Sequence, residues 1–124
     1  MRLFGITILR NEADIVEAWV RHNLTVLDGM AVVDHGSMDG TSDILDALQR
    51  EGLPLRVMRD ASPGFFQAER MTALARQTLV RERADFTFVI DADEFIKAES
   101  RASLERALAE IPPDAHATEA LLRQ

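Results

Sequence analysis

The chain has 124 residues, of which 47% are hydrophobic and 28% are charged, and its formal net charge is -7. This length and composition fit one soluble globular domain with its own core. The negative charge disfavours nucleic acid and anionic membranes as partners, and the absence of cysteine excludes disulfides and thiolate zinc sites. No apolar run approaches the roughly 20 residues of a membrane span, and the first five residues are too strand-like for a signal peptide. We therefore expect a cytoplasmic protein.

The hydrophobic pattern predicts strands that alternate with helices. Apolar runs typical of buried strands lie at residues 3–9, 30–33, 55–58 and 86–90. Apolar residues at helical spacing predict helices at residues 15–24, 44–48, 66–79 and, after Ser100, 101–111. The last ten residues could form a helical turn or begin another strand.

Turn and cap signals separate these elements. Asn11 or Asp14 can cap the first helix, and Gly29 is expected to end it. Gly52 is expected to end the second helix, and Ser100 to cap the last one. Turn-forming residues at 62–64 break the chain before the third helix, and two prolines at 112–113 end the fourth.

The loop after the second strand is rich in glycine and capping residues. Gly36 and Gly40 are expected to supply unusual backbone angles. Ser37, Asp39 and Thr41 are expected to be structural, because their side chains can satisfy free N–H groups of the following helix.

The alternation of strands and helices predicts an α/β fold for residues 1–124 as a single domain. Such a pattern gives a Rossmann-like three-layer sandwich, with a mostly parallel sheet and helices on both faces. Ligands bind beyond the carboxyl ends of the strands in such sheets. Polar residues stand at these strand ends: Arg10, Asn11 and Glu12; Asp34; Arg59 and Asp60; Asp91 and Asp93. We expect them to converge on one edge.

The acids after the fourth strand suggest a cation. Asp91, Asp93 and Glu94 lie within four residues and repel one another. A divalent cation between Asp91 and Asp93, with phosphate on its far side, would relieve that repulsion. A solvated turn is the alternative interpretation, and the other polar strand ends favour the cation. Glu94 is expected to be structural or to act indirectly.

These motifs resemble the nucleotide-binding half of family 2 glycosyltransferases, which have the GT-A fold. The resemblance covers residues 1–98 and rests on three pieces in the family's order: residues 9–12, 33–41 and 91–95. It implies transfer of a sugar from a nucleotide-diphosphate donor to an acceptor that the sequence does not identify. A departure is His35 after Asp34, where the family often carries a second acid.

The resemblance also implies roles for individual residues. Asp93, the second acid of the D-x-D motif, would ligate Mn²⁺ or Mg²⁺ that bridges the diphosphate, and Asp91 would face the ribose or a metal-bound water. Asp34 would lie by the base or ribose, although it could also only cap its loop. Arg10, Asn11 and Glu12 would line the nucleotide pocket.

Proteins of this family have a second half that binds the acceptor and carries the catalytic base. We find no counterpart of that half in this sequence. A nucleotide-sugar-binding module or an inactive fragment is therefore an alternative function, and an uncovered sheet edge could pair two copies. A phosphotransferase of the haloacid-dehalogenase type ranks low, because Phe95 stands where that motif needs Thr or Val.

Trp19 is expected in the core by its helical register, and His22 as a half-buried packing residue. Glu12 could instead pair with Arg10.

Overall fold

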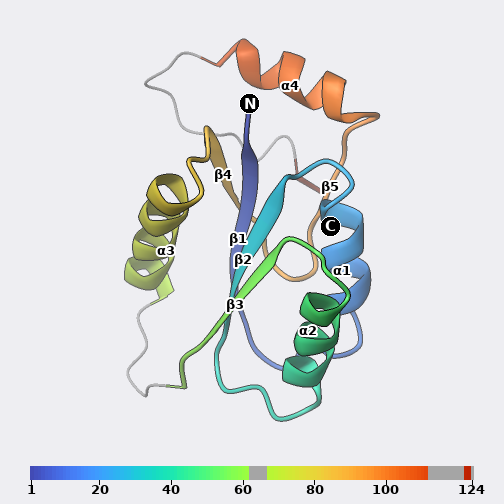
Figure 1. Cartoon of the computed structure of the whole chain (residues 1–124), viewed down its shortest axis with the longest axis vertical. Helices are drawn as coiled ribbons and strands as arrows, with labels where there is room; N and C mark the ends of the chain where they lie inside the picture. The colour runs from blue at the N-terminus through green and yellow to red at the C-terminus, as the bar shows by residue number, and fades with distance from the viewer. Residues whose placement is uncertain (62–66, 112–121, 124) are drawn as a thin grey trace.

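The computed structural model describes residues 1–61, 67–111 and 122–123 (Figure 1). The chain has an α/β fold, and the predicted alternation of strands and helices is confirmed. The elements are β1 (Leu3–Leu9), α1 (Val16–Asn23), β2 (Gly29–Asp34), α2 (Thr41–Arg50), β3 (Leu55–Arg59), α3 (Gln67–Arg81), β4 (Phe86–Val89), β5 (Phe95–Ile96), α4 (Arg101–Ala109) and β6 (Leu122–Arg123). The first four strands form an all-parallel sheet in the order β3-β2-β1-β4, and β5 and β6 form a small antiparallel pair.

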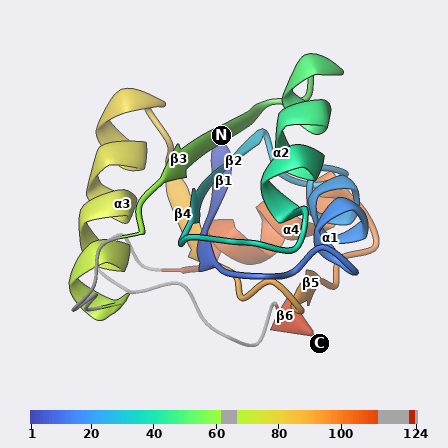
Figure 2. The same ribbon diagram turned by 90° about the horizontal axis from the view of Figure 1, so that it is seen from below.

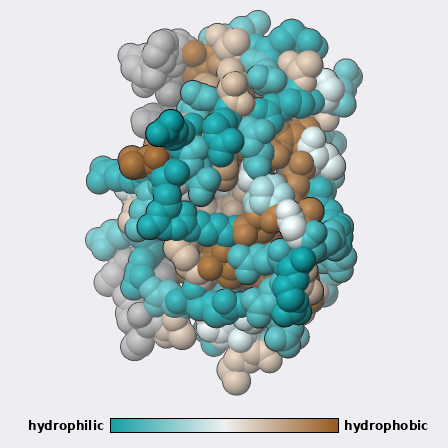
Figure 3. Space-filling model, viewed as in Figure 1, coloured by the Kyte–Doolittle hydropathy of each residue, from teal (hydrophilic) through white to brown (hydrophobic). Residues whose placement is uncertain are grey.

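The sheet is the middle of three layers, with α1 and α2 on one face and α3 on the other (Figure 2). Alternate residues of the strands point to opposite faces, so two core clusters form. Leu3, Met30 and Val32 pack with α1 and α2 residues on one face, whereas Ile6 and Ala31 pack with α3 on the other. Hydrophilic residues cover most of the surface in Figure 3, with hydrophobic patches between them. No described helix is long and apolar enough to cross a membrane.

The ends of α1 differ from the prediction. Ile15 precedes the helix without a side-chain cap, so the prediction that Asn11 or Asp14 caps it was wrong. The helix ends at Asn23, and Gly29 instead begins β2. A Cβ atom at Gly29 would lie 2.5 Å from the Phe4 ring. A glycine is therefore needed at this position because the strand packs against the Phe4 ring, and not because a helix ends here.

The other predicted ends agree with the structure. Gly36, Gly40 and Gly52 have φ angles of 65°, 101° and 97°, the left-handed conformations that favour glycine. Ser100 caps α4, and its hydroxyl accepts the Ser103 N–H at 3.1 Å. The predicted break at 62–64, Phe66, the prolines at 112–113 and His116 lie outside the described residues.

Strand β4 is less buried than its sequence suggests. Phe88 and Ile90 are buried on the α1 side, but Val89 is 47% exposed. The prediction that both faces are covered was therefore wrong for this strand. The reason is its place at the edge of the sheet, where it pairs only with β1 in the parallel sheet.

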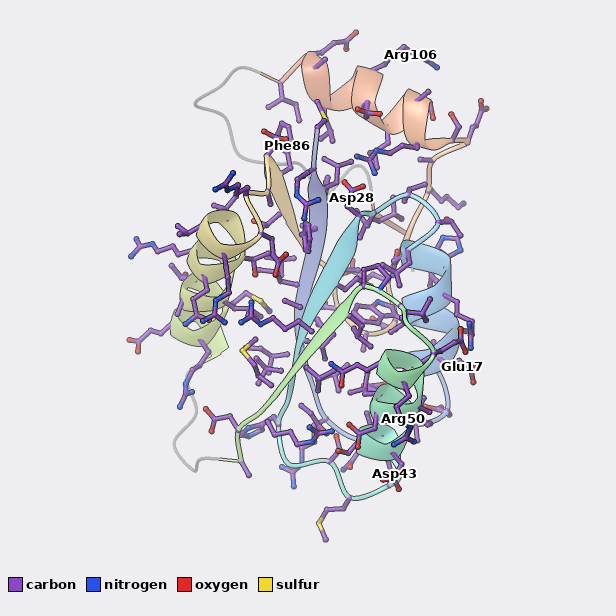
Figure 4. The ribbon with its side chains drawn as sticks, viewed as in Figure 1. Glu17, Asp28, Asp43, Arg50, Phe86 and Arg106 are labelled. Atoms are coloured by element: carbon purple, nitrogen blue, oxygen red, sulfur yellow. The ribbon has the colours of Figure 1, made fainter. Side chains whose placement is uncertain are left out.

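Helix α4 packs Leu104 and Leu108 into the core, and its Arg101 bonds to the amino end of the sheet. Arg101 donates to the carbonyls of Met1 and Val26 and to the Asp28 carboxylate, at 2.6, 3.0 and 2.8 Å. Asp28 also accepts the Leu3 N–H at 2.7 Å. In Figure 4, Asp28 lies beside α4, at the opposite end of the molecule from Asp43 in the first turn of α2. This leaves the carboxyl end of the sheet to loops.

Candidate functional site

The carboxyl ends of the four parallel strands meet at one edge, as predicted. Strand register pairs Leu9 with Asp34 and Asp34 with Arg59. On the other side of β1, the Ile90 N–H donates to Ile6, so Asp91 follows at the same end. Figure 2 views the molecule from this end. The strand order reverses around β1, because β2 and β3 lie on one side of it and β4 on the other. Ligands bind at such a switch point in open α/β sheets.

The loop after β1 is fastened to the loop after β2. Asn11 has a φ of 54°, and its N–H donates to the Ser37 hydroxyl at 2.9 Å. Its side-chain oxygen accepts the Met38 N–H at 2.8 Å. The Asn11 amide is thus partly used to hold the two loops together.

Two further bonds complete this connection between the loops. The Glu12 N–H donates to the Thr41 hydroxyl at 2.9 Å, and the Ala13 N–H donates to the Asp39 carboxylate at 3.1 Å. Ser37, Asp39 and Thr41 are structural, as predicted, but their side chains mainly bond to the backbone of the loop after β1. Of the three, Asp39 alone accepts an N–H from α2, that of Thr41 at 3.0 Å.

Asp34 ends β2 and is buried, with 2% of its surface exposed. One carboxylate oxygen accepts the Ser37 N–H at 3.1 Å, and its carbonyl accepts the Asp60 N–H at 3.1 Å. Nδ1 of His35 lies 2.7 Å from the Asp60 carbonyl. The loop-capping interpretation of Asp34 is therefore realised, and its place at the strand end is the predicted one.

Residues 91–94 form a tight turn, here called the acid turn. The Glu94 N–H donates to the Asp91 carbonyl, and the Asp91 N–H donates to the Glu94 carboxylate, both at 2.9 Å. Glu94 is thus structural, as expected. Asp91 and Asp93 are exposed. No cation from the described part of the chain pairs with either carboxylate.

The loop after β1, here called the first loop, lies near the acid turn. Partial burial raises the pKa of the Glu12 carboxyl, and the nearby charges of Asp14, Asp93 and Asp39 raise this pKa further. Acids from three different loops therefore lie close to one another. Within the described residues Glu12 has no ion pair with Arg10, which is exposed. The predicted pairing of these two residues is not observed.

The residues of the acid turn fit a hard divalent cation. Carboxylate oxygens are the ligands that Mg²⁺ and Mn²⁺ prefer. Among residues 1–61, 67–111 and 122–123, no three acidic or histidine side chains gather to form a full set of metal ligands. Two exposed carboxylates would leave the remaining positions to phosphate and water, as is usual for Mg²⁺ bound with nucleotides.

A hollow of about 200 Å³ opens beside this edge, between β3 and α3. Its lining includes the apolar residues Val33 and Met58 and the polar residues Asp60, Arg70 and Gln77. Arg70 contacts the Asp60 carboxylate.

Two residues of α1 that hold the acid turn were not predicted in that role. Trp19 is fully buried, as expected for a core residue, but its indole N–H also donates to the Asp91 carbonyl at 2.8 Å. Asn23 is fully buried and bonds to the backbone of Glu94 and Ile96. A polar residue four positions after Trp19, on the apolar face of the helix, was the available signal. His22 is exposed, although its ring packs edge-on against Phe95.

Comparison with solved structures identifies the type of fold. The chain is similar to the mannosyltransferase PcManGT from Pyrobaculum calidifontis in complex with GDP-Man and Mn²⁺, with a TM-score of 0.60, 25% identity, and coverage of 86% of this chain and 31% of that chain. It is also similar to S. aureus TarS 1-349 in complex with UDP, with a TM-score of 0.58, 24% identity, and coverage of 88% and 31%. No protein-family model and no curated protein matches the chain. The fold is that of GT-A-like glycosyltransferases, and the chain spans about a third of the length of these two proteins.

Proposed function

We propose that this chain is the nucleotide-sugar-binding half of a metal-dependent glycosyltransferase of family 2. The donor is a nucleotide-diphosphate sugar of the UDP or GDP type, since the two structural neighbours hold GDP-Man and UDP. The observation that carries the proposal is the convergence of the polar strand ends, with Asp34 and the exposed Asp91 and Asp93, at the switch point of the sheet. Residues 1–124 form one domain in this proposal, and the acceptor site lies in a further domain.

Each part of the edge has its own role in this proposal. Asp93 ligates Mn²⁺ or Mg²⁺, and Asp91 faces the ribose or a metal-bound water. Asp34 and the first loop, with Arg10 and Glu12, line the nucleoside. The support for the loop is its fixed shape: both its backbone and the Asn11 side chain bond to the loop after β2. The hollow beside β3 offers room for the base.

The bound cation would neutralise the departing nucleoside diphosphate and act as a Lewis acid on it. The chain's own contribution is to orient and to bind. The two hydrogen bonds between Asp91 and Glu94 fix the acid turn, so both free carboxylates are presented without a large ordering cost. No covalent nucleophile with a partnered base stands among the site residues, which favours direct displacement with inversion. The base for that step belongs to the acceptor half.

The test is isothermal titration calorimetry with UDP and GDP, with and without Mn²⁺. We expect nucleotide binding that strengthens with Mn²⁺, and loss of that metal dependence in Asp93→Ala. The matched control is Glu110→Ala, which removes an exposed acid just after α4 at the other end of the sheet. No metal-dependent binding by the unmodified protein, or binding unchanged in Asp93→Ala, would remove the proposal. Binding without release of sugar to any acceptor would support the binding-module alternative.

A further inference from the structure

Helix α1 contacts the backbone of residues 91–96 through three side chains on two successive turns. The indole N–H of Trp19 donates to the Asp91 carbonyl at 2.8 Å. The Asn23 side chain donates to the Glu94 carbonyl at 3.3 Å and accepts the Ile96 N–H at 2.9 Å. Nε2 of His22 lies 2.9 Å from the Ile96 carbonyl. These contacts join positions that are more than 70 residues apart in the chain.

We propose that Trp19, His22 and Asn23 are positioning residues that set the place of the acid turn and thereby the affinity for the cation. This inference rests on the proposed function and deepens it. None of the three side chains carries a metal-binding carboxylate, and each of them bonds to the backbone of the turn or of β5. They therefore act through Asp91 and Asp93, not on the ligand.

Burial explains why these bonds restrain the turn. Trp19 and Asn23 are both fully buried, so their polar groups need partners within the protein. The Asn23 amide also donates to the Trp19 carbonyl at 3.0 Å, which fixes its orientation. A buried amide whose hydrogen bonds are all satisfied keeps one orientation, and it therefore restrains the backbone segment to which it bonds. The exposed acids thus stand on a backbone anchored in the core.

Helix α1 contacts two parts of the proposed site, the first loop and the acid turn. The helix begins just after the first loop, where the Glu12 carbonyl accepts the N–H groups of Ile15 and Val16 at 3.1 and 2.8 Å. The other end of the same helix holds the acid turn. One helix therefore connects the part of the site proposed to line the nucleoside with the part proposed to hold the cation. Loosening α1 from the turn should change metal affinity more than metal-free nucleotide affinity.

The first test needs no metal. Amide hydrogen exchange is followed by NMR at Glu94 and Ile96 in the full chain, in Trp19→Phe and in the matched control Val20→Ala. Val20 is fully buried on the same helix and has no side-chain hydrogen bond, so its truncation lowers stability without touching the turn. We expect exchange at Glu94 and Ile96 to be about two- to tenfold faster in Trp19→Phe than in Val20→Ala, the effect of losing one hydrogen bond.

The exposed residue His22 provides a second variant, which keeps the core intact. His22→Ala removes the contact to the Ile96 carbonyl and leaves the bond from the Ile96 N–H to Asn23. It should therefore speed exchange at Ile96 by loosening β5 and leave the rest of the chain unchanged, even where Trp19→Phe fails to fold. Equal exchange in His22→Ala and the unmodified protein, or exchange in Trp19→Phe no faster than in Val20→Ala, would overturn the proposal. Both readouts are independent of the cation, so they still decide the matter when no metal binds and the proposed function fails.

The second test uses the cation itself. Trp19 is the sole tryptophan in the sequence, and it touches the acid turn, so Mn²⁺ bound there should quench its fluorescence. We expect quenching by Mn²⁺ in the presence of UDP or GDP, with an apparent affinity about two- to tenfold weaker in His22→Ala. Metal-free nucleotide affinity should stay the same in that variant. Equal metal affinity in His22→Ala and the unmodified protein would show that the turn needs no such support.

Discussion

Thr41→Val is the sharpest test of the connection between the first two loops. Thr41 is fully buried, and its hydroxyl donates to the Asp39 carboxylate at 2.5 Å while accepting the Glu12 N–H at 2.9 Å. Valine has nearly the same shape, so the substitution leaves no cavity. It removes both bonds and leaves the partly buried Glu12 N–H without an acceptor.

The expected cost follows from that unpaired group. An unsatisfied buried donor costs about 1–3 kcal/mol, so we expect Thr41→Val to lower the free energy of unfolding by about 2 kcal/mol. The melting temperature should fall by about 6–10 °C for a domain of this size. Thr41→Ser is the control, because it keeps the hydroxyl and loses only a methyl group, at about 1 kcal/mol. Urea denaturation followed by Trp19 fluorescence measures both.

The pKa of Asp39 gives a second measurement of the same bond. The Thr41 hydroxyl is the main cause of its lowered pKa; slight burial opposes the shift, and the N–H groups of Ala13 and Thr41 add to it. The Asp39 pKa should rise toward its ordinary value in Thr41→Val and stay low in Thr41→Ser, as followed by carboxyl NMR. Equal stability of Thr41→Val and the unmodified protein, or a larger loss in Thr41→Ser, would refute the reasoning.

Four further predictions concern stability. Arg101→Ala should cost about 2–3 kcal/mol, because it removes charge-assisted bonds to Asp28 and to two carbonyls; chemical denaturation checks it. Partial burial alone would raise the pKa of Asp28, but Arg101 and a backbone N–H outweigh it and lower that pKa. Stability from this carboxylate is present above its unfolded pKa and lost as pH falls through the folded pKa, so Asp28→Asn should lose less stability on acidification than the unmodified protein. The Glu12 pKa is raised, so its ionisation destabilises the folded state as pH rises through that value; Glu12→Gln should add about 0.2–1 kcal/mol at neutral pH and less in acid. Gly29→Ala should lower the melting temperature through its clash with the Phe4 ring, at about 1–3 kcal/mol.

The sequence predicted the strands and their polar ends well, because both are local signals. Apolar runs that stop at a polar residue locate the carboxyl ends of β1, β2 and β3, and Asp34 ends β2 as expected. The connection of Asn11 to Ser37 was not predictable, since it joins a backbone N–H to a side chain 26 positions away. The prediction that Gly29 ends a helix failed for a similar reason. In a sequence, a glycine required by contact with a neighbouring strand cannot be distinguished from a glycine that ends a helix. Long-range packing decides such positions.

The distribution of charge gives the strongest argument for a cation at the carboxyl edge. The protein has arginines that pair closely with acids, but these pairs lie away from the acid turn. Arg21 bonds to Glu51 with two contacts of 2.7 Å, and Arg101 bonds to Asp28 beside α4. Asp91 and Asp93 have no such partner in the described part of the chain. The acids of several loops at this edge repel one another, and solvent screens part of that repulsion. The nearby Arg59 and Arg70 pair with Asp46 and Asp60 instead of with the acid turn. In the proposed function a cation and a diphosphate would reduce this repulsion, since the cation would offset the acids of the protein and those of the nucleotide.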